Sequence, residues 1–255
     1  MSDLIEKNPW ADLRRFTSAR IALGRAGNSL PTDELLRFGV AHAQARDAVH
    51  QPFEAARVAA DLLAIGRDSV LVHSAAPDRA HYLRRPDLGR RLDESSRAVL
   101  SAVRADAPQH LAIVIADGLS ARAVHDHAVP LLTSLLAALA TDNWRVTPIV
   151  IAQQSRVALG DEIGERLGAE IVAVLIGERP GLSSPDSLGV YVTYAPQVGR
   201  TDAERNCISN VRPQGLSYQQ AARRMLFLLN AVRRLRLTGV QLKDDSDVPS
   251  LTREA

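Results

Sequence analysis

The second half of the chain alternates short apolar runs with segments in which apolar residues recur at helical spacing. Near-continuous apolar runs cover 111–116, 146–151 and 171–176, and a fourth strand is expected at 189–194. Runs without polar alternation are typical of parallel strands that are buried on both faces. Strands that alternate with helices favour an α/β fold. We therefore expect a Rossmann-like, mostly parallel sheet with helices on both faces.

The helices between these runs have recognisable ends. Ser120 is expected to cap the helix after the first run, and Gly168 to close the helix before the third run. Ser217 and Gln220 form a capping box ahead of a long helix that reaches about Arg236. These signals indicate that each apolar run is followed by a helix that can cover the sheet.

The first part of the chain is predicted to be mostly helical. Thr32 is expected to be the N-cap of a helix with apolar residues at helical spacing, and Pro52 ends that helix. We therefore expect a small helical N-terminal domain at 1–105, a Rossmann-like domain at 106–245 and a polar tail at 246–255. Within the first domain, helices are expected at 12–22, 53–65 and 94–104, a short strand at 70–73, and a basic loop at 84–91.

Composition excludes several classes of protein. The 255 residues are enough to bury a sizeable core, and no apolar run approaches the roughly 20 residues that span a bilayer. A single cysteine excludes an intrachain disulfide and fits a reducing cytosol. A net charge of +2 and 4% aromatic residues give no argument for nucleic-acid binding. We expect a cytoplasmic protein with neither a membrane nor a nucleic-acid partner.

Common signatures of catalysis and nucleotide binding are absent from the sequence. No G-x-G-x-x-G follows the first apolar run, and the sequence contains no P-loop, no G-x-S-x-G and no H-E-x-x-H. We therefore do not expect a self-sufficient dehydrogenase, ATPase or hydrolase.

A long polar stretch, 177–210, follows the third apolar run and is the predicted working surface. Ligands of open α/β sheets bind beyond the carboxyl ends of the strands. Glu178 comes directly after the third run, where its carboxylate could accept hydrogen bonds from a ligand. The alternative is an ion pair with a neighbouring arginine such as Arg179.

Other polar residues have a structural and a functional interpretation. Asp117-Gly-Leu-Ser120 is either turn and cap chemistry or a contact to a ligand or anion at the helix N-terminus. Val157, after the second run, either packs in the core or contacts a ligand. His125 and His127 are two positions apart on a helix and point to different faces, so solvated histidines are favoured over a metal pair.

Cys207 is expected in a loop rich in hydrogen-bonding side chains. The sequence has no histidine after His127, which argues against a catalytic Cys–His pair. A structural or ligand-contact role is favoured for the thiol. The residues alone therefore predict a ligand-binding α/β domain without an evident catalytic apparatus, which could complete a site on a partner chain.

Several motifs, in order along nearly the whole chain, resemble one family. Together they are similar to the small (light) subunit of ethanolamine ammonia-lyase. The motifs are Arg25-Ala-Gly, Leu35-Leu-Arg-Phe, Arg85-Pro-Asp-Leu-Gly-Arg-Arg-Leu, Asp117-Gly-Leu-Ser, Gly177-Glu-Arg-Pro-Gly-Leu and Cys207-Ile-Ser-Asn.

The resemblance implies a role in the conversion of ethanolamine to acetaldehyde and ammonia with adenosylcobalamin. In this family the radical chemistry takes place in the barrel of a separate large subunit, and the small subunit covers the cobalamin within a hetero-oligomer. The family's cobalamin-contact positions correspond to Val157, Glu178 and Cys207. No catalytic residue and no metal ligand is expected on this chain.

Two alternatives accompany this prediction. Some family members carry a long N-terminal extension associated with a bacterial microcompartment, whereas here the shared region begins after Trp10. Cytoplasm is therefore the expected location, with a microcompartment as the alternative. The alternative function is a stand-alone small-molecule-binding or scaffolding α/β protein.

Overall fold

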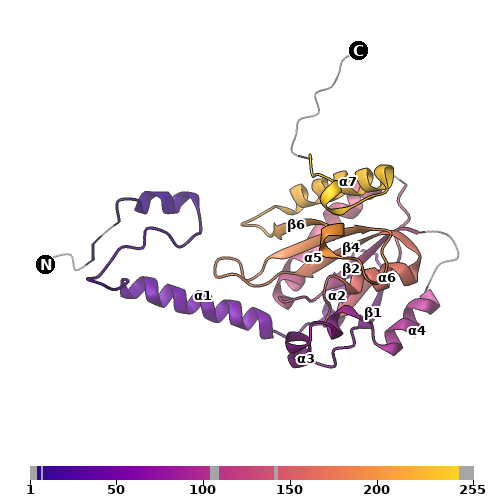
Figure 1. Cartoon of the computed structure of the whole chain (residues 1–255), viewed down its shortest axis with the longest axis horizontal. Coiled ribbons are helices and arrows are strands. Elements are labelled where there is room, and N and C mark those ends of the chain that lie inside the picture. Colours follow the sequence, from indigo (N-terminus) through magenta and orange to yellow (C-terminus); the bar gives the residue numbers. More distant parts are fainter. Residues whose placement is uncertain (1–4, 7, 104–108, 141–142, 247–255) are drawn as a thin grey trace, which may run out of the picture.

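The molecule has two parts that differ in shape (Figure 1). A computed structural model describes residues 5–6, 8–103, 109–140 and 143–246. The described residues up to 50 form an extended part, which we call the N-terminal arm. The described residues from 51 onwards form a body built around one sheet, which we call the sheet body.

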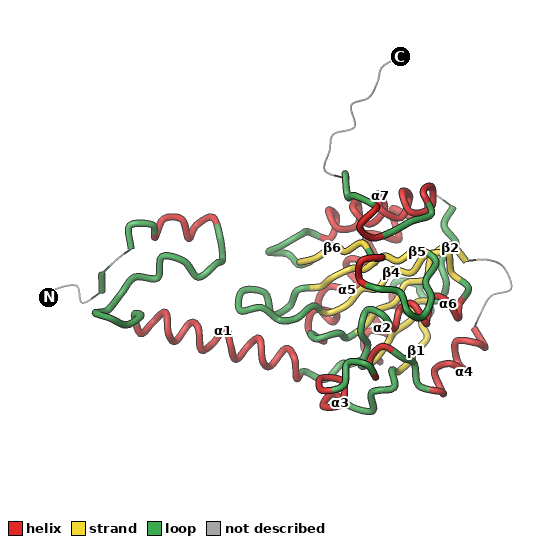
Figure 2. The backbone as a smooth tube through the Cα atoms, in the orientation of Figure 1, coloured by secondary structure: helices red, strands yellow, loops and turns green. Residues whose placement is uncertain are grey.

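The sheet has six strands in the order β1-β3-β2-β4-β5-β6 (Figure 2). The first four in this order pair in parallel, whereas β5 is antiparallel to both β4 and β6. The α/β class is confirmed, and the sheet is mixed. The strands are β1 Ser69–His73, β2 Gln109–Ala116, β3 Ile149–Gln153, β4 Ala169–Gly177, β5 Leu188–Tyr194 and β6 Asn206–Val211.

Helices cover both faces of the sheet. Side chains of α2, α5 and α7 form one core cluster with the strands, and those of α4 and α6 form the other. None of the helices in the described part of the chain is long and apolar enough to cross a membrane. The α-helices are α1 Thr32–His50, α2 Ala55–Ala64, α3 Arg79–Arg84, α4 Glu94–Val103, α5 Ala121–Leu139, α6 Leu159–Leu167 and α7 Tyr218–Leu235, and the 3₁₀ helices are η1 Ala11–Phe16, η2 Leu88–Arg90, η3 Asp202–Glu204 and η4 Gly239–Gln241.

Burial on two sides explains the continuous apolar runs. In β2, Leu111, Ile113 and Ile115 belong to one core cluster. The alternate residues Ala112 and Val114 belong to the cluster on the opposite face. Because successive side chains of a strand point to opposite faces, a strand covered on both sides needs apolar residues at every position.

The predicted helix ends in the sheet body are confirmed. Ser120 Oγ accepts a hydrogen bond from Ala123 N at 3.3 Å, and Ser217 forms its capping box with Gln220 at the start of α7. Gly168 ends α6 with φ +68°. These ends fix where each helix begins relative to the strand before it.

Several predicted elements need correction. The strand expected at 146–151 begins at Ile149, because Pro148 has no N–H for the ladder, and Val146 forms only an isolated bridge to Leu111. The helix expected at 12–22 is the 3₁₀ helix η1, which ends at Phe16. Strand β6 occupies a segment that was expected to be a loop.

The N-terminal part also differs from the prediction. Thr32 is the first helical residue rather than the N-cap, and α3 and η2 occupy part of the expected basic loop at 84–91 and the residues before it. The short strand expected at 70–73 is confirmed as β1, and it pairs with β3 of the sheet. The division of the chain near residue 105 stays a prediction, and the polar tail lies outside the described residues except for Ser246.

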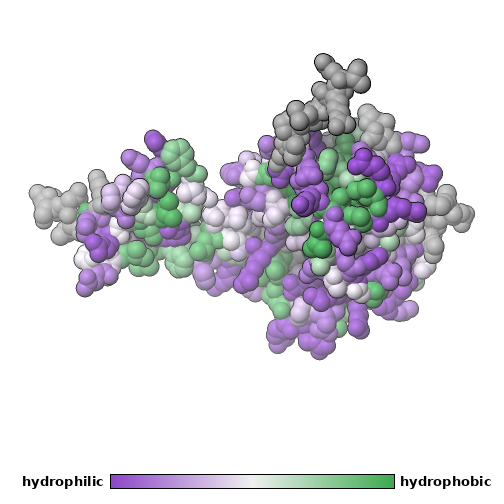
Figure 3. All heavy atoms as spheres, turned by 45° about the horizontal axis from the view of Figure 1, so that its top comes forward, coloured by the Kyte–Doolittle hydropathy of each residue, from purple (hydrophilic) through white to green (hydrophobic). Residues whose placement is uncertain are grey.

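The N-terminal arm consists of α1 and a preceding segment that folds back along it (Figure 1). The buried Glu34 holds the two together, because it forms an ion pair with Arg14 at 2.8 Å and its carbonyl accepts from Arg20 at 2.8 Å. Large apolar side chains remain outside, and Phe16 is 74% exposed and Leu36 65% exposed. Figure 3 shows hydrophobic surface along this arm.

Candidate functional site

The carboxyl ends of β2, β3 and β4 lie together, and Asp117 joins the first two. Its Oδ1 accepts from Ser155 N at 2.8 Å and its Oδ2 from Gln154 N at 3.0 Å. Burial raises the pKa of Asp117 to about 6, opposed by these hydrogen bonds and by the Arg79 charge. The side chain is 1% exposed. Asp117 therefore positions the loop after β3 and does not face a ligand.

Two glycines let the ends of β2 and β4 approach each other. Gly118 has φ +56°, and Leu119 N donates to the Gly177 carbonyl at 2.9 Å. A Cβ on Gly177 would lie 2.1 Å from the Ser120 carbonyl oxygen. The turn and cap interpretation of residues 117–120 accounts for these contacts.

Glu178 follows β4, and its carboxylate has a fixed orientation. Ser209 Oγ donates to Oε1 at 2.5 Å, Asn210 N donates to Oε2 at 3.2 Å, and Ser187 Oγ also donates to Oε2. The side chain lies against Gly189, where a Cβ would be 2.9 Å from Oε1. The expected alternative, an ion pair with Arg179, is not what holds the carboxylate.

A pocket of about 490 Å³ lies at this edge of the sheet. It brings together Val157 and Glu178, two of the three predicted contact residues, which are 21 positions apart in the sequence. Other residues of its wall come from α3, from the loop after β3 and from strands β5 and β6. They include Tyr82, Arg156, Tyr191 and Ser209. Val157 also packs against the apolar cluster below it, so both interpretations of this residue hold geometrically.

Cys207, the third predicted residue, lies beside the pocket on β6 and not in a loop. It pairs across the strands with Tyr191, and its residue surface is exposed. Desolvation raises the pKa of the Cys207 thiol, a hydrogen bond with Tyr191 opposes the rise, and the Glu178 charge adds to it. A thiol of raised pKa is mostly protonated near neutral pH, which argues against a nucleophile.

A stack of one aromatic ring and two guanidinium groups supports the base of the pocket. The Arg156 guanidinium lies 4.2 Å from the centre of the Tyr82 ring, and that of Arg79 lies 4.8 Å from it. Tyr82 is fully buried and its hydroxyl donates to the Ser155 carbonyl at 3.1 Å. Among the side-chain atoms of the described residues, the buried Nε of Arg156 has no hydrogen-bond partner.

The prediction of solvated histidines on α5 was wrong. His125 is 8% exposed and His127 is 4% exposed. They do point to different sides, because the Nε2 of His125 accepts from Glu54 N at 2.9 Å, whereas His127 contacts Tyr218 Oη at 2.9 Å. Within the part of the chain that the structure describes, no cluster of three or more potential metal ligands occurs.

Three residues of the pocket were missed from sequence. Tyr191 lies on β5 and Ser209 on β6, and Tyr82 comes from a helix that was not predicted. Alternation in Val-Tyr-Val-Thr, residues 190–193, places Tyr191 and Thr193 on one face of β5, opposite Val190 and Val192. That alternation could have identified Tyr191, whereas nothing local identifies Tyr82.

The fold and the pocket define an α/β protein with a candidate ligand-binding pocket at the carboxyl edge of its sheet. A family model described as "Ethanolamine ammonia-lyase light chain (EutC)" matches residues 7–243. The chain belongs to this family, as its motifs predicted.

Relatives from several bacteria are similar over nearly their whole length. An ethanolamine ammonia-lyase small subunit of Pseudomonas fluorescens Pf-5 is 56% identical, with 96% of this chain and 90% of the relative covered. One of Pseudomonas putida KT2440 is 58% identical and one of Ralstonia nicotianae GMI1000 is 56% identical. In both of these comparisons, 97% of this chain and 92% of the relative are covered.

Proposed function

We propose that this chain is the small subunit of an adenosylcobalamin-dependent ethanolamine ammonia-lyase and completes the cobalamin site on a large subunit. The observation that carries the proposal is the carboxylate of Glu178. Three donors fix it at a pocket that Val157 also lines. These residues occupy two of the positions that contact cobalamin in the family, and the third, Cys207, lies on the neighbouring strand.

The donor set of this pocket fits cobalamin. The corrin ring carries amide side chains, whose N–H groups can donate to the Glu178 carboxylate, and the unpartnered Nε of Arg156 can donate to an amide oxygen. Val157 and Tyr191 supply apolar surface beside these groups. The cofactor supplies radical chemistry through homolysis of its cobalt–carbon bond. The residues of this chain bind and orient it and exclude water from one side.

The exposed apolar residues of the N-terminal arm favour a protein partner. Trp10, Phe16, Leu35 and Leu36 are all exposed on it, and large apolar side chains gathered on one exposed part of a protein favour an interaction site. The relatives are named small subunits, which implies a large subunit in their assemblies. We assign this surface of the arm to the large subunit of the same enzyme.

The proposal also covers the type of sheet and the location of the protein in the cell. We describe the parallel part of the sheet as Rossmann-like, because strands and helices alternate through β2, β3 and β4. We place the chain in the cytoplasm because it has a single cysteine, which suits a reducing compartment. Packaging in a microcompartment remains the alternative.

Co-expression with a large subunit tests the function. The pair should form acetaldehyde from ethanolamine when adenosylcobalamin is added, and each subunit alone should form none. Full activity of the large subunit alone would show that this chain does not complete the site. A pair that forms a complex but no acetaldehyde would contradict the proposed reaction. A chain that forms neither a complex nor acetaldehyde with the large subunit would favour a stand-alone binding or scaffolding protein.

A further inference from the structure

A second pocket, of about 600 Å³, adjoins the first and shares Arg156 and Val157 with it. Its charged wall residues are four arginines and two aspartates. They are Arg90, Arg91, Arg156, Arg200, Asp87 and Asp202. A ligand bound in the first pocket can therefore extend into this second, basic pocket.

The segment that carries Arg90 and Arg91 is held in place through its backbone. Arg156 N donates to the Gly89 carbonyl and Ala75 N donates to the Arg91 carbonyl, both at 2.8 Å. Leu92 N donates to the Glu162 carboxylate at 2.9 Å. The two arginines thus stand on a fixed backbone, although their side chains are exposed.

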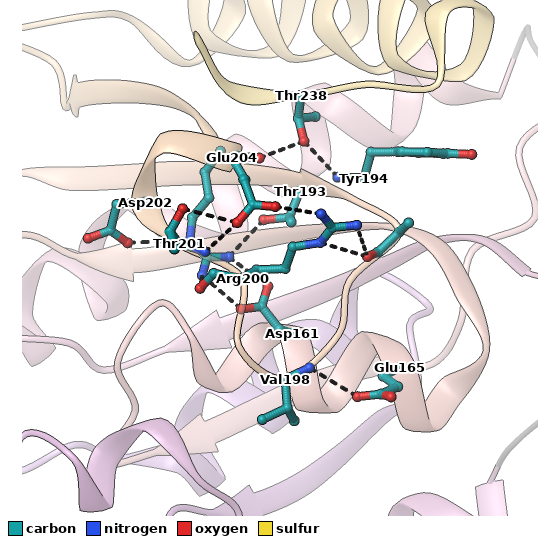
Figure 4. A network of polar contacts seen from close by, with 12 residues as sticks. Asp161, Glu165, Thr193, Tyr194, Val198, Arg200, Thr201, Asp202, Glu204 and Thr238 are labelled. Atoms are coloured by element: carbon teal, nitrogen blue, oxygen red, sulfur yellow. Dashed lines mark hydrogen bonds and ion pairs between the residues drawn. The ribbon is translucent and has the colours of Figure 1, made fainter. Parts of the chain in front are cut away.

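The opposite wall is held by a buried ion pair. Arg205 donates two hydrogen bonds to Asp161, at 2.6 and 2.8 Å, and a third to the Arg200 carbonyl at 2.9 Å. Figure 4 shows the loop before β6, in which Thr201 and Arg200 donate to the Glu204 carboxylate, while Val198 N donates to Glu165 on α6. Both walls of the pocket are therefore held in place by contacts within the protein before a ligand binds.

The carboxylates of this pocket already have partners, whereas two of its cations do not. Arg85 binds Asp87 with two hydrogen bonds, at 2.9 and 2.8 Å, and Arg205 lies 3.4 Å from Asp202. Across the described ranges, no hydrogen bond or ion pair involves the side chain of Arg90 or Arg91. The charge of Arg91 contributes to a lowered pKa of Asp87 without a direct contact. The pocket is therefore built with uncompensated positive charge.

We infer that this basic pocket binds a phosphate group, and that the phosphate belongs to the nucleotide loop of the cobalamin proposed for the adjoining pocket. Paired guanidinium groups favour phosphate over neutral ligands because they form charge-assisted, bidentate hydrogen bonds. The inference rests on the proposed function, since it assigns part of the same cofactor. Inorganic phosphate is the other source of the same chemistry.

Three corrinoids separate the contributions in the assembled complex with the large subunit. Adenosylcobalamin carries the whole nucleotide loop, adenosylcobinamide phosphate keeps a phosphate without the base, and adenosylcobinamide has neither. Equilibrium binding is followed by the change in the corrinoid absorption spectrum. Arg90→Ala/Arg91→Ala should lose about tenfold to a hundredfold in affinity for the two phosphate-bearing ligands, as expected for charge-assisted hydrogen bonds. Its affinity for adenosylcobinamide should not change.

The control variant Arg67→Ala/Arg223→Ala removes the same charge from exposed positions outside both pockets. It should bind all three ligands as the wild type does. Arg90→Lys/Arg91→Lys should recover part of the lost affinity. Inorganic phosphate should compete with adenosylcobinamide phosphate and not with adenosylcobinamide.

Specific results would overturn the inference. Equal losses for all three corrinoids, or a reduced yield of the complex, would mean that the two arginines act on the fold or on the large subunit. Unchanged affinity for all three would mean that no phosphate binds there, with the proposed function intact. A wild-type complex that binds none of the corrinoids would refute the proposed function, and this inference with it.

Discussion

The sheet body and the N-terminal arm use the same kinds of apolar residue in opposite ways. In the sheet body, Leu132 on α5 is completely buried, whereas on the arm Leu36 is 65% exposed. Both residues lie on helices of 19 residues. The difference lies in the surroundings, because α5 packs against the sheet and against α2 and α7, whereas α1 has a short folded-back segment beside it.

This comparison shows that an apolar stripe predicts a helix but not what covers it. Apolar residues of a helix that pack against a sheet stabilise the folded chain, because folding removes their surface from water. A helix face without a neighbour keeps its apolar surface in water until a partner arrives. We therefore expect substitutions in the two regions to affect different measurements.

The largest effect on stability is expected at the buried ion pair of the sheet body. Both side chains are almost completely buried, so Arg205→Ala leaves the Asp161 carboxylate without its partner. The expected loss is about 3–5 kcal/mol in the free energy of unfolding, measured by urea denaturation of the isolated chain. A loss as small as that of a surface ion pair would show that the Asp161–Arg205 pair does not hold the loop before β6.

A pair of leucine variants tests the comparison directly. Leu132→Ala should lower the free energy of unfolding by about 2–5 kcal/mol, because it leaves a cavity in the core. Leu36→Ala should change it by no more than about 0.5 kcal/mol. Equal losses in urea denaturation would mean that the arm is packed as tightly as the body.

Binding of the large subunit should depend more on the N-terminal arm than on the sheet body. Leu35→Ser/Leu36→Ser should weaken binding of the large subunit by about tenfold or more, as for apolar residues at the centre of an interface. The matched control is Leu63→Ser on α2, a leucine of the sheet body that is 67% exposed. Titration calorimetry of both variants measures the difference. Equal effects would remove the arm from the interface.

The smallest effect is expected in the acid limb of the stability curve. A backbone hydrogen bond from Thr201 and a side-chain hydrogen bond from Arg200 lower the pKa of Glu204 to about 2. The unfolded value is about 4.3, so this group contributes stability above about pH 4.3 that is lost as pH falls toward 2. Glu204→Gln should flatten the decline of the urea midpoint over this range. An unchanged slope would show that this carboxylate is not linked to folding.

Most of the sheet body could be predicted from sequence, because its strands are buried on both faces. The runs at 111–116 and 171–176 lie inside β2 and β4. The segment with Cys207 was not recognised as a strand because β6 is an edge strand in which only Ile208 and Val211 are buried, so it lacks a regular alternation of apolar and polar residues. Its pairing depends on β5 and has no local signal.

The candidate site could be predicted only in part. Glu178 was identified because its position after a buried strand is encoded locally. The contacts of the pocket to Tyr82 and Tyr191 depend on how α3 and β5 pack. The buried positions of His125 and His127 were missed for the same reason, since α2 and α7 cover them from elsewhere in the chain.

The affinity of the assembled complex for adenosylcobalamin tests the central claim most directly. Glu178→Ala should weaken this affinity by about tenfold to a hundredfold, which corresponds to about 1–3 kcal/mol for a lost directed polar contact. Glu170→Ala is the matched control, because Glu170 is exposed near the opposite end of the same strand β4. Weaker binding is expected for Glu178→Ala alone, with complex formation intact. Equal affinity of the wild type and Glu178→Ala would contradict a role of Glu178 in holding the cofactor.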